Sequence, residues 1–379
     1  MRIALPRVLG AAALLATWAA QPLAASSIQE GAPAPQGAGE PGEPAAPEPE
    51  EPEIVPEPAP DYRPDKVLFH PSGAKAAEGS LVNGRREGFW THFHEGGQRQ
   101  ARGSYERYRK VGPWVVWHPS GPRKEQGHYA EGERDGRWVF WHTNGTKSKE
   151  GSFARGREEG PWTYWRASGN LAAAGSFANG QRVGPWKEFH ENGRTWREGR
   201  YERGQQEGTW SEWHDSGQLY QRGAFRSGAP TGQWTAWYPS GKKLSEGVQD
   251  AHGQTGVWTK WHENGQKEFE GQWHHGREEG PWTRWHPSGA VLAEGSYAAG
   301  RMVGPWVNYH ENGQKESEVS FTDGEANGPF RSWHANGQRA SEGQYVLGRR
   351  EGRWMFWNED GTPQEDLCGS YSNDVRVGP

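Results

Sequence analysis

Aromatic and glycine residues recur along this chain with a fixed period of 24 residues. Each unit carries Gly-x-Trp, a second aromatic three residues after the Trp, a polar residue, and then a turn that ends in Gly. The period holds through twelve units, in which Phe330 alone replaces the Trp. A constant period of this length is typical of a solenoid, in which each unit packs only on its neighbours. The anchoring glycines are Gly88, Gly112, Gly136, Gly160, Gly184, Gly208, Gly232, Gly256, Gly280, Gly304, Gly328 and Gly352.

Each unit is predicted to form two β-strands. Residues 184–189 are short and rich in aromatics, which favours a strand. Glu191-Asn192-Gly193 follows, and equivalent turns read Pro-Ser-Gly, which favours a type I turn with a bulge over type I′. Residues 198–201, Glu-Gly-Arg-Tyr, are the second strand. A Gly-rich polar loop such as 179–184 is then expected to lead to the next unit.

A single hairpin of this kind is not stable alone, so neighbouring units must pair their edges. The sequence therefore predicts an all-β fold: an elongated, antiparallel, single-layer sheet of about thirteen 24-residue β-hairpin repeats. Trp186 and Phe189 are three residues apart. Either both faces of the sheet carry aromatics, or a bulge brings the two together.

The ends and two internal stretches depart from the pattern. Residues 64–73 form a degenerate first unit, and the last unit, near Cys368, lies two residues late. Residues 248–256 lack the usual Tyr and shift the loop Gly by one. Val319 replaces a Gly, as Phe330 replaces a Trp. Relaxed structural constraint and a grafted partner site are both compatible with these breaks.

The N-terminal part of the chain differs from the repeats and divides it into three regions. Residues 1–25 have a basic start, an apolar stretch too short to span a membrane, and small residues before Ser26, as in a secretory signal peptide. Residues 26–64 are rich in Pro and Glu and predict an extended, disordered linker, with a docking motif for a partner as the alternative. The repeat array occupies residues 65–379. The mature chain is therefore expected to be exported, to the periplasm, the cell surface or the medium.

Charge and cysteine content narrow the possible functions. The linker carries nine acidic residues against Arg63, which leaves the array nearly neutral within a chain of formal net charge −5. Nucleic-acid binding needs a basic surface and is not expected. Cys368 is the only cysteine, so no internal disulfide is possible, and the thiol is either incidental or able to crosslink two chains.

The pattern Gly-x-Trp-x-x-[Trp/Phe]-His-x-Asn-Gly followed by Glu-Gly-x-Tyr resembles the MORN-repeat variant of many bacterial proteins, over about residues 66–379. That family is often labelled as an antitoxin component of toxin–antitoxin systems. The resemblance implies a trough-shaped antiparallel sheet that acts as a binding scaffold. Related MORN modules are associated with protein partners and with phospholipid membranes.

Histidine is the most frequent candidate ligand, because it follows the second aromatic in ten units. Equivalent positions in successive hairpins lie roughly 10 Å apart, too far to share a zinc ion. A polar residue beside a turn is the preferred interpretation, and a pH-sensitive ladder is the alternative. His274 and His275 are expected to point to opposite faces. The ten residues are His70, His94, His118, His142, His190, His214, His262, His286, His310 and His334.

No catalytic, cofactor-binding or metal-binding residues are predicted, because no Ser/His/Asp order, phosphate loop or Cys/His cluster stands apart from the repeat. Glu-Glu-Gly at 158–160 and 278–280 lies in a polar loop and is not a catalytic pair. The Trp columns are interpreted as core or trough lining. The predicted function is therefore a non-enzymatic scaffold that binds a protein partner along an aromatic-lined trough. An antitoxin- or immunity-like role and binding of envelope glycan or phospholipid are the alternatives.

Overall fold

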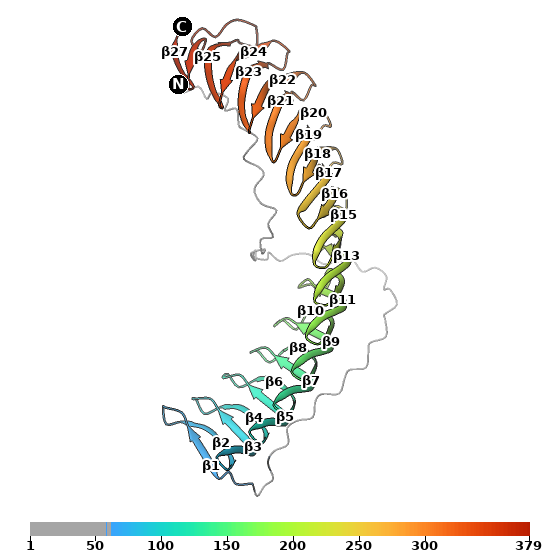
Figure 1. Ribbon diagram of the computed structural model, residues 1–379, viewed down its shortest axis with the longest axis vertical. Helices are drawn as coiled ribbons and strands as arrows, with labels where there is room; N and C mark the ends of the chain where they lie inside the picture. The colour runs from blue at the N-terminus through green and yellow to red at the C-terminus, as the bar shows by residue number, and fades with distance from the viewer. Residues whose placement is uncertain (1–57, 59–61) are drawn as a thin grey trace, which may run out of the picture. The chain divides into compact units, whose positions relative to one another are not determined.

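The computed structural model describes Pro58 and residues 62–379, and it forms one antiparallel sheet of 27 strands in that part of the chain. The predicted signal peptide and most of the predicted linker lie outside the described residues. Each strand pairs with the strands before and after it in the sequence, so the hairpins follow one another in chain order (Figure 1). The predicted all-β repeat sheet is confirmed.

Two types of strand alternate along the sheet, and they have the following bounds. The long strands, which carry the Gly-x-Trp motif, are β3 (Arg85–Phe93), β5 (Arg109–Trp117), β7 (Glu133–Trp141), β9 (Arg157–Trp165), β11 (Gln181–Phe189), β13 (Gln205–Trp213), β15 (Ala229–Trp237), β17 (Gly253–Trp261), β19 (Arg277–Trp285), β21 (Arg301–Tyr309), β23 (Glu325–Trp333) and β25 (Arg349–Phe356). The short strands are β2 (Lys75–Val82), β4 (Arg99–Glu106), β6 (Arg123–Ala130), β8 (Lys147–Ala154), β10 (Leu171–Ala178), β12 (Thr195–Glu202), β14 (Leu219–Arg226), β16 (Lys243–Asp250), β18 (Lys267–His274), β20 (Val291–Ala298), β22 (Lys315–Thr322) and β24 (Arg339–Val346). The ends are β1 (Lys66–Phe69), β26 (Gly369–Ser372) and β27 (Val375–Gly378).

The turn after each long strand has the predicted geometry. In the turn after β11, the N–H of Gly193 donates to the carbonyl of His190 at 3.0 Å, and Gly193 has φ of +83°. The N–H of His190 donates to the carbonyl of Arg194 at 2.8 Å. This is a type I turn followed by a left-handed residue and a bulge, and Gly fits because it adopts positive φ without strain.

The prediction of a Gly-rich loop between units is wrong, because the connection is a two-residue turn. Asn179 and Gly180 have φ of +51° and +79°, as in a type I′ turn, and β11 begins at Gln181. The anchoring Gly184 lies inside the strand, where φ of +68° makes a bulge against β10. The connection at Ala251-His252 differs, because there the positive φ moves to Gly253.

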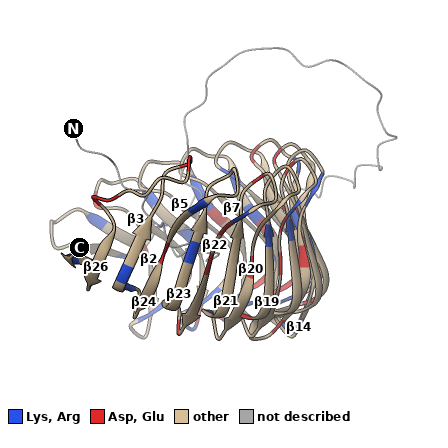
Figure 2. Ribbon diagram, turned by 90° about the horizontal axis from the view of Figure 1, so that it is seen from above, with Lys and Arg blue, Asp and Glu red and all other residues tan. Residues whose placement is uncertain are grey.

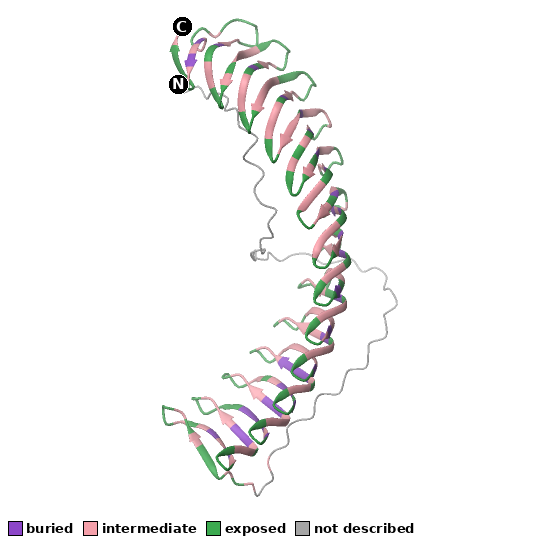
Figure 3. Ribbon diagram, viewed as in Figure 1, coloured by how far each residue is buried: buried purple, intermediate pink, exposed green. Residues whose placement is uncertain are grey.

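The anchoring Trp residues form the core on one side of the sheet, here called the Trp face. Trp90, Trp114 and Trp138 are fully buried, although the sheet has a single layer. Side chains converge on the concave side of a bent sheet. The anchoring Trp residues stay buried along the whole array, at 0–8% exposure, so the Trp face is assigned to the inside of the trough. Figure 2 shows that the strands are bent, and Figure 3 shows that buried positions are densest in the N-terminal hairpins.

The Glu-Gly-x-[Tyr/Phe] motif is explained by the contact between neighbouring units. The ring of Trp114 lies over the backbone of Gly103, where a Cβ would be 2.3 Å from the indole carbons. Tyr105 and Tyr129 flank the same indole edge-on, with ring centroids at 5.1 and 6.0 Å. Gly therefore admits the Trp, and the Tyr two residues later adds a T-shaped aromatic pair.

The aromatic column divides into three clusters. The first contains Trp90 to Phe225, the second contains Trp282 and Trp306, and the third contains Phe330 and Trp354. The first break coincides with Gln249, which stands where the two neighbouring units have Phe225 and Trp273. The second lies at the irregular pair Val319 and Phe330.

Candidate functional site

The second aromatic of each unit lies on the face opposite the Trp face, here called the outer face. Trp165, for example, is half-buried, and the ammonium of Lys147 lies 5.9 Å from its ring centroid. Lys147 also pairs with Glu150, whose cross-strand neighbours are Val139 and Thr163. Each of these residues directly follows a buried Trp in its strand, so its side chain points to the opposite face. Both faces therefore carry aromatics, which decides between the two alternatives that the spacing left open.

The histidine ladder links successive units by hydrogen bonds. In each of the ten units, His Nε2 lies 2.8–3.3 Å from the carbonyl oxygen of the second aromatic in the next unit, as between His190 and Trp213. A carbonyl only accepts, so Nε2 carries the proton in each bond. Arg166 and Tyr238 donate to the same carbonyl position at 2.7 Å. The polar position beside the turn is therefore a hydrogen-bond donor that joins successive hairpins.

The other candidate residues also have structural contacts. Glu158 pairs with Lys149 at 3.3 Å, whereas Glu159 accepts from the backbone N–H of Asn179 at 2.8 Å. The two carboxylates thus serve different contacts, one ion pair and one turn. Cys368 is half-buried, and its Sγ accepts from the N–H of Phe356 at 3.4 Å.

The expectation that His274 and His275 point to opposite faces is wrong. Their rings stack with centroids 4.0 Å apart, because His275 has φ of +49° in a tight turn and does not continue the strand. His252, from the preceding tight turn, lies 4.8 Å from His275. Across Pro58 and residues 62–379, no group of three His, Cys, Asp or Glu side chains is arranged to hold a metal ion.

A row of variable residues borders the buried Trp column on the Trp face. It comprises the position two residues after each Trp and its cross-strand partner, such as His92 and Ala101 or Glu188 and Arg197. The anchoring positions repeat almost without change, whereas this row changes from unit to unit between small, aromatic, acidic and basic residues. The row is therefore free to carry specificity, because the fold does not fix its residue types.

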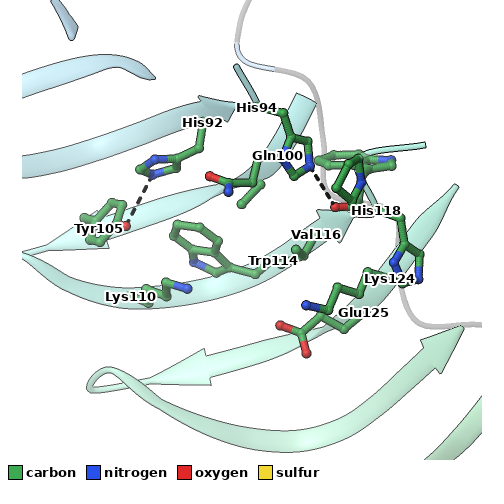
Figure 4. Close-up of a pocket in the computed structure, with 13 residues that line it drawn as sticks. His92, His94, Gln100, Tyr105, Lys110, Trp114, Val116, His118, Lys124 and Glu125 are labelled. Carbon is green, nitrogen blue, oxygen red and sulfur yellow. Dashed lines mark hydrogen bonds between the residues drawn. The ribbon is translucent and has the colours of Figure 1, made fainter. Parts of the chain in front are cut away.

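Two hollows open along this row. The first, of about 400 Å³, is floored by Ala101 and Trp114, with Lys110 and Glu125 among its walls. Figure 4 shows Trp114 with His92 and Tyr105 on one side and Lys124 and Glu125 on the other. Both hollows occur where the row carries an Ala, whose small side chain leaves the space.

The second hollow, of about 340 Å³, has equivalent walls three units later. Ala173, Trp186 and Arg182 occupy the positions of Ala101, Trp114 and Lys110, and Glu188 replaces Val116. Three units are six strands, or roughly 29 Å along the sheet. The trough thus presents two similar hollows, each with an Ala–Trp floor and with both basic and acidic side chains in its walls.

Burial lowers the pKa values of two side chains in the first hollow, His92 and Lys110. It lowers the pKa of His92 to about 4, and the charges of Arg86 and Lys110 contribute in the same direction. Burial also lowers the pKa of Lys110, an effect that Glu125 opposes. His92 is therefore neutral at physiological pH, and Lys110 is the partly desolvated cation of the hollow.

Comparison with known proteins supports the repeat assignment. The MORN repeat variant family matches six segments of the chain, residues 182–203, 206–226, 254–275, 278–299, 302–323 and 326–346. The chain is thus similar to MORN repeats in those six units, which lie between residues 182 and 346. A search of the curated proteins gives no match.

Among solved structures, the chain matches the crystal structures of TcdB2-TccC3-Cdc42 and TcdB2-TccC3 and a Photorhabdus luminescens Tc holotoxin pore. The identities are 11%, 12% and 9%, over 78%, 82% and 78% of this chain. The chain covers only 17%, 16% and 19% of those chains, with a TM-score of 0.15 in each case. Scores this low support no inference about function.

Proposed function

We propose that this protein is a non-enzymatic repeat scaffold that binds an extended segment of a partner protein along the Trp-face trough. The observation that carries the proposal is the pair of hollows at Ala101 and Ala173, at equivalent positions three units apart. An extended polypeptide rises ~3.3 Å per residue, so about nine residues of a partner would span the roughly 29 Å between the hollows.

The trough supplies the features of a peptide-binding groove: an apolar floor, convergent polar groups and a rigid support. The buried Trp rings are the floor and are not themselves the contact surface, since most of their area is already covered. A partner with apolar side chains for the hollows and an acidic group for Lys110 or Arg182 fits best. Export and an immunity-like role are consistent with this proposal and stay predictions.

The test fills the hollows without changing the scaffold. Phe269 occupies the same row as Ala101 and Ala173, so Ala101→Phe with Ala173→Phe introduces a residue that the repeat accommodates. Ala293→Phe is the matched control, because Ala293 lies in that row but lines neither hollow. The wild-type chain and both variants are used to capture proteins from the envelope fraction of the producing cells.

A stoichiometric partner that is retained by the wild type and by Ala293→Phe, and lost by the double variant, supports the proposal. Equal retention by all three would exclude the hollows as the binding site. Sedimentation of all three with liposomes or cell wall, and without a protein partner, would instead favour the half-exposed aromatics of the outer face.

A further inference from the structure

A continuous line of buried residues crosses the outer face of the first hairpins. Thr91, Arg102, Val115, Gln126 and Val139 are direct cross-strand neighbours on β3 to β7, and this set is here called the outer row. Their exposed fractions are 7%, 8%, 4%, 2% and 1%. A single-layer sheet has no second layer to cover such a line, so its burial requires an explanation.

The same positions are more exposed in later units. Val307 is equivalent to Val115 and Val139 and has the same side chain, yet it is only half-buried. Arg222 is equivalent to Arg102 and is exposed. In the later units only the small residues Ser211 and Thr259 are buried at these positions, and each stands alone. The repeat itself therefore does not bury the outer row.

The chain before the array reaches this face at Tyr62. Its hydroxyl donates to the carbonyl of Phe89 at 2.6 Å, and its ring lies edge-on to that of Phe89. The guanidinium of Arg102 lies 5.1 Å from the Phe89 ring centroid. Tyr62 is thus positioned at the β3 end of the outer row, and the residues that precede it in the sequence continue from there.

We propose that residues 51–61, the acidic proline-rich segment just before Tyr62, dock across the outer row in an extended conformation. The row spans four strand spacings, roughly 19 Å, and a polyproline II chain covers that distance in about six residues. Counting back from Tyr62 brings Ile54 and Val55 to the β7 end, beside Val139.

The chemistry of the two surfaces matches. Glu51, Glu53 and Glu57 supply carboxylates, and Arg102 and Arg137 are cations of the outer face. Ile54 and Val55 are the only large aliphatic residues between Pro33 and Pro64, and they fit the two valines. Proline lacks an N–H donor but keeps its carbonyl, so such a segment suits a surface that donates from Arg and Gln side chains.

The outer row is thereby a second binding surface, separate from the trough and specific for an acidic proline-rich chain. Its occupation by the chain's own segment would hold residues 51–61 against the first hairpins. It would also keep the outer face of β3–β7 from other partners while that contact lasts.

The test is disulfide formation in the full chain with Cys368→Ser as background. Two double variants are compared. The first carries Val55→Cys and Val139→Cys. The control carries Val55→Cys and Val307→Cys, so its second thiol has the equivalent position in a distant unit. The expected result is an intrachain disulfide for Val139→Cys at a yield about tenfold above that for Val307→Cys, which lies more than 30 Å further along the sheet. Equal yields, or none at either position, would overturn the proposal.

Two further measurements make the result specific. Glu51, Glu53 and Glu57 lie outside the array, so replacing them by Lys leaves the repeats unchanged. The replacement is expected to lower the disulfide yield of the Val139→Cys variant about fivefold at low salt and to have little effect at high salt. A yield unaffected by the three Lys residues would exclude the charge contacts. A disulfide-linked dimer in place of the intrachain product would assign the surface to the segment of a second copy and overturn the intrachain docking.

Discussion

Val319 and Phe330 are the two substitutions that break the Gly–Trp pattern, and they are cross-strand neighbours. At the equivalent contact of the next unit, a Cβ on Gly343 would lie 2.2 Å from the indole of Trp354. A side chain at the Gly position is therefore incompatible with Trp across the strand pair. Phe is smaller than Trp, and Val319 packs against the third aromatic cluster in the space that an indole would fill.

This geometry predicts strong coupling between the two positions. Phe330→Trp alone forces an indole against Val319 and is expected to cost ~1–3 kcal/mol of stability by overpacking. Val319→Gly alone removes a packed side chain and adds backbone entropy, for a loss of ~2 kcal/mol. The double variant restores the Gly–Trp contact and adds an indole N–H bond to the carbonyl of Ser320, worth ~1 kcal/mol. Nine Trp residues make this bond at 2.9–3.2 Å.

The assay is a double-mutant cycle read by hydrogen exchange of β22–β24 and by denaturant unfolding of the full chain. The double variant should be within ~1 kcal/mol of the wild type, so most of the summed single losses of about 3–5 kcal/mol should be recovered, which gives a coupling energy of at least ~2 kcal/mol. The reverse cycle, Gly343→Val with Trp354→Phe, should show coupling of the same sign. Additive effects in both cycles, within ~0.5 kcal/mol, would refute the compensation.

Four further outcomes are expected. Gly127→Ala should destabilise the array by ~3 kcal/mol in denaturant unfolding, because the added Cβ would be 2.3 Å from Trp138. His190→Phe should lose ~1 kcal/mol and raise local hydrogen exchange at Trp213, whereas His190→Arg, which reproduces Arg166, should be nearly neutral. Because the pKa of His92 is lowered to about 4 from 6.5, its contribution to stability is complete above pH 6.5 and is lost as pH falls toward 4, as a wild-type profile compared with His92→Gln would measure. Gln249→Tyr should join the first two aromatic clusters through two T-shaped ring pairs, each worth ~0.5–1.5 kcal/mol, and should raise the unfolding midpoint of β15–β17; an unchanged midpoint would show that the break has another cause.

Most of the repeat fold could be predicted from the sequence, because the period, the aromatic spacing and the turn residues all repeat a dozen times. The lengths of the strands were harder to predict. The pattern predicts a loop that ends at Gly184, but a strand accommodates Gly at a bulge. The two-residue turn at Asn179 therefore lets β11 begin at Gln181. Whether one face of the sheet or both carry aromatics could be decided only from the strand register, since a bulge between the two aromatics would have brought them to the same face.

The candidate surfaces were harder to predict, because they depend on the absence of side-chain volume or on contacts outside the period. Ala101 and Ala173 open hollows only because their neighbours are larger, and nothing in the residue type Ala indicates this. The burial of Arg102 and Gln126 has no counterpart in the other units. The acidic, proline-rich composition before Tyr62 predicts a linker or a docking motif for a partner, and nothing in it indicates which residues of the array are buried.

The three aromatic clusters have a consequence for how the scaffold responds to a partner. In a repeat array, stability is the sum of unit stabilities and of interfaces between neighbours, so a weak interface lets the parts on either side open separately. Trp234 and Trp258 on either side of Gln249 are 8% and 6% exposed, against 0% for Trp114. Both hollows lie within the first, most buried cluster. A partner that bridges them therefore meets the most rigid part of the array, where little ordering entropy remains to be lost on binding.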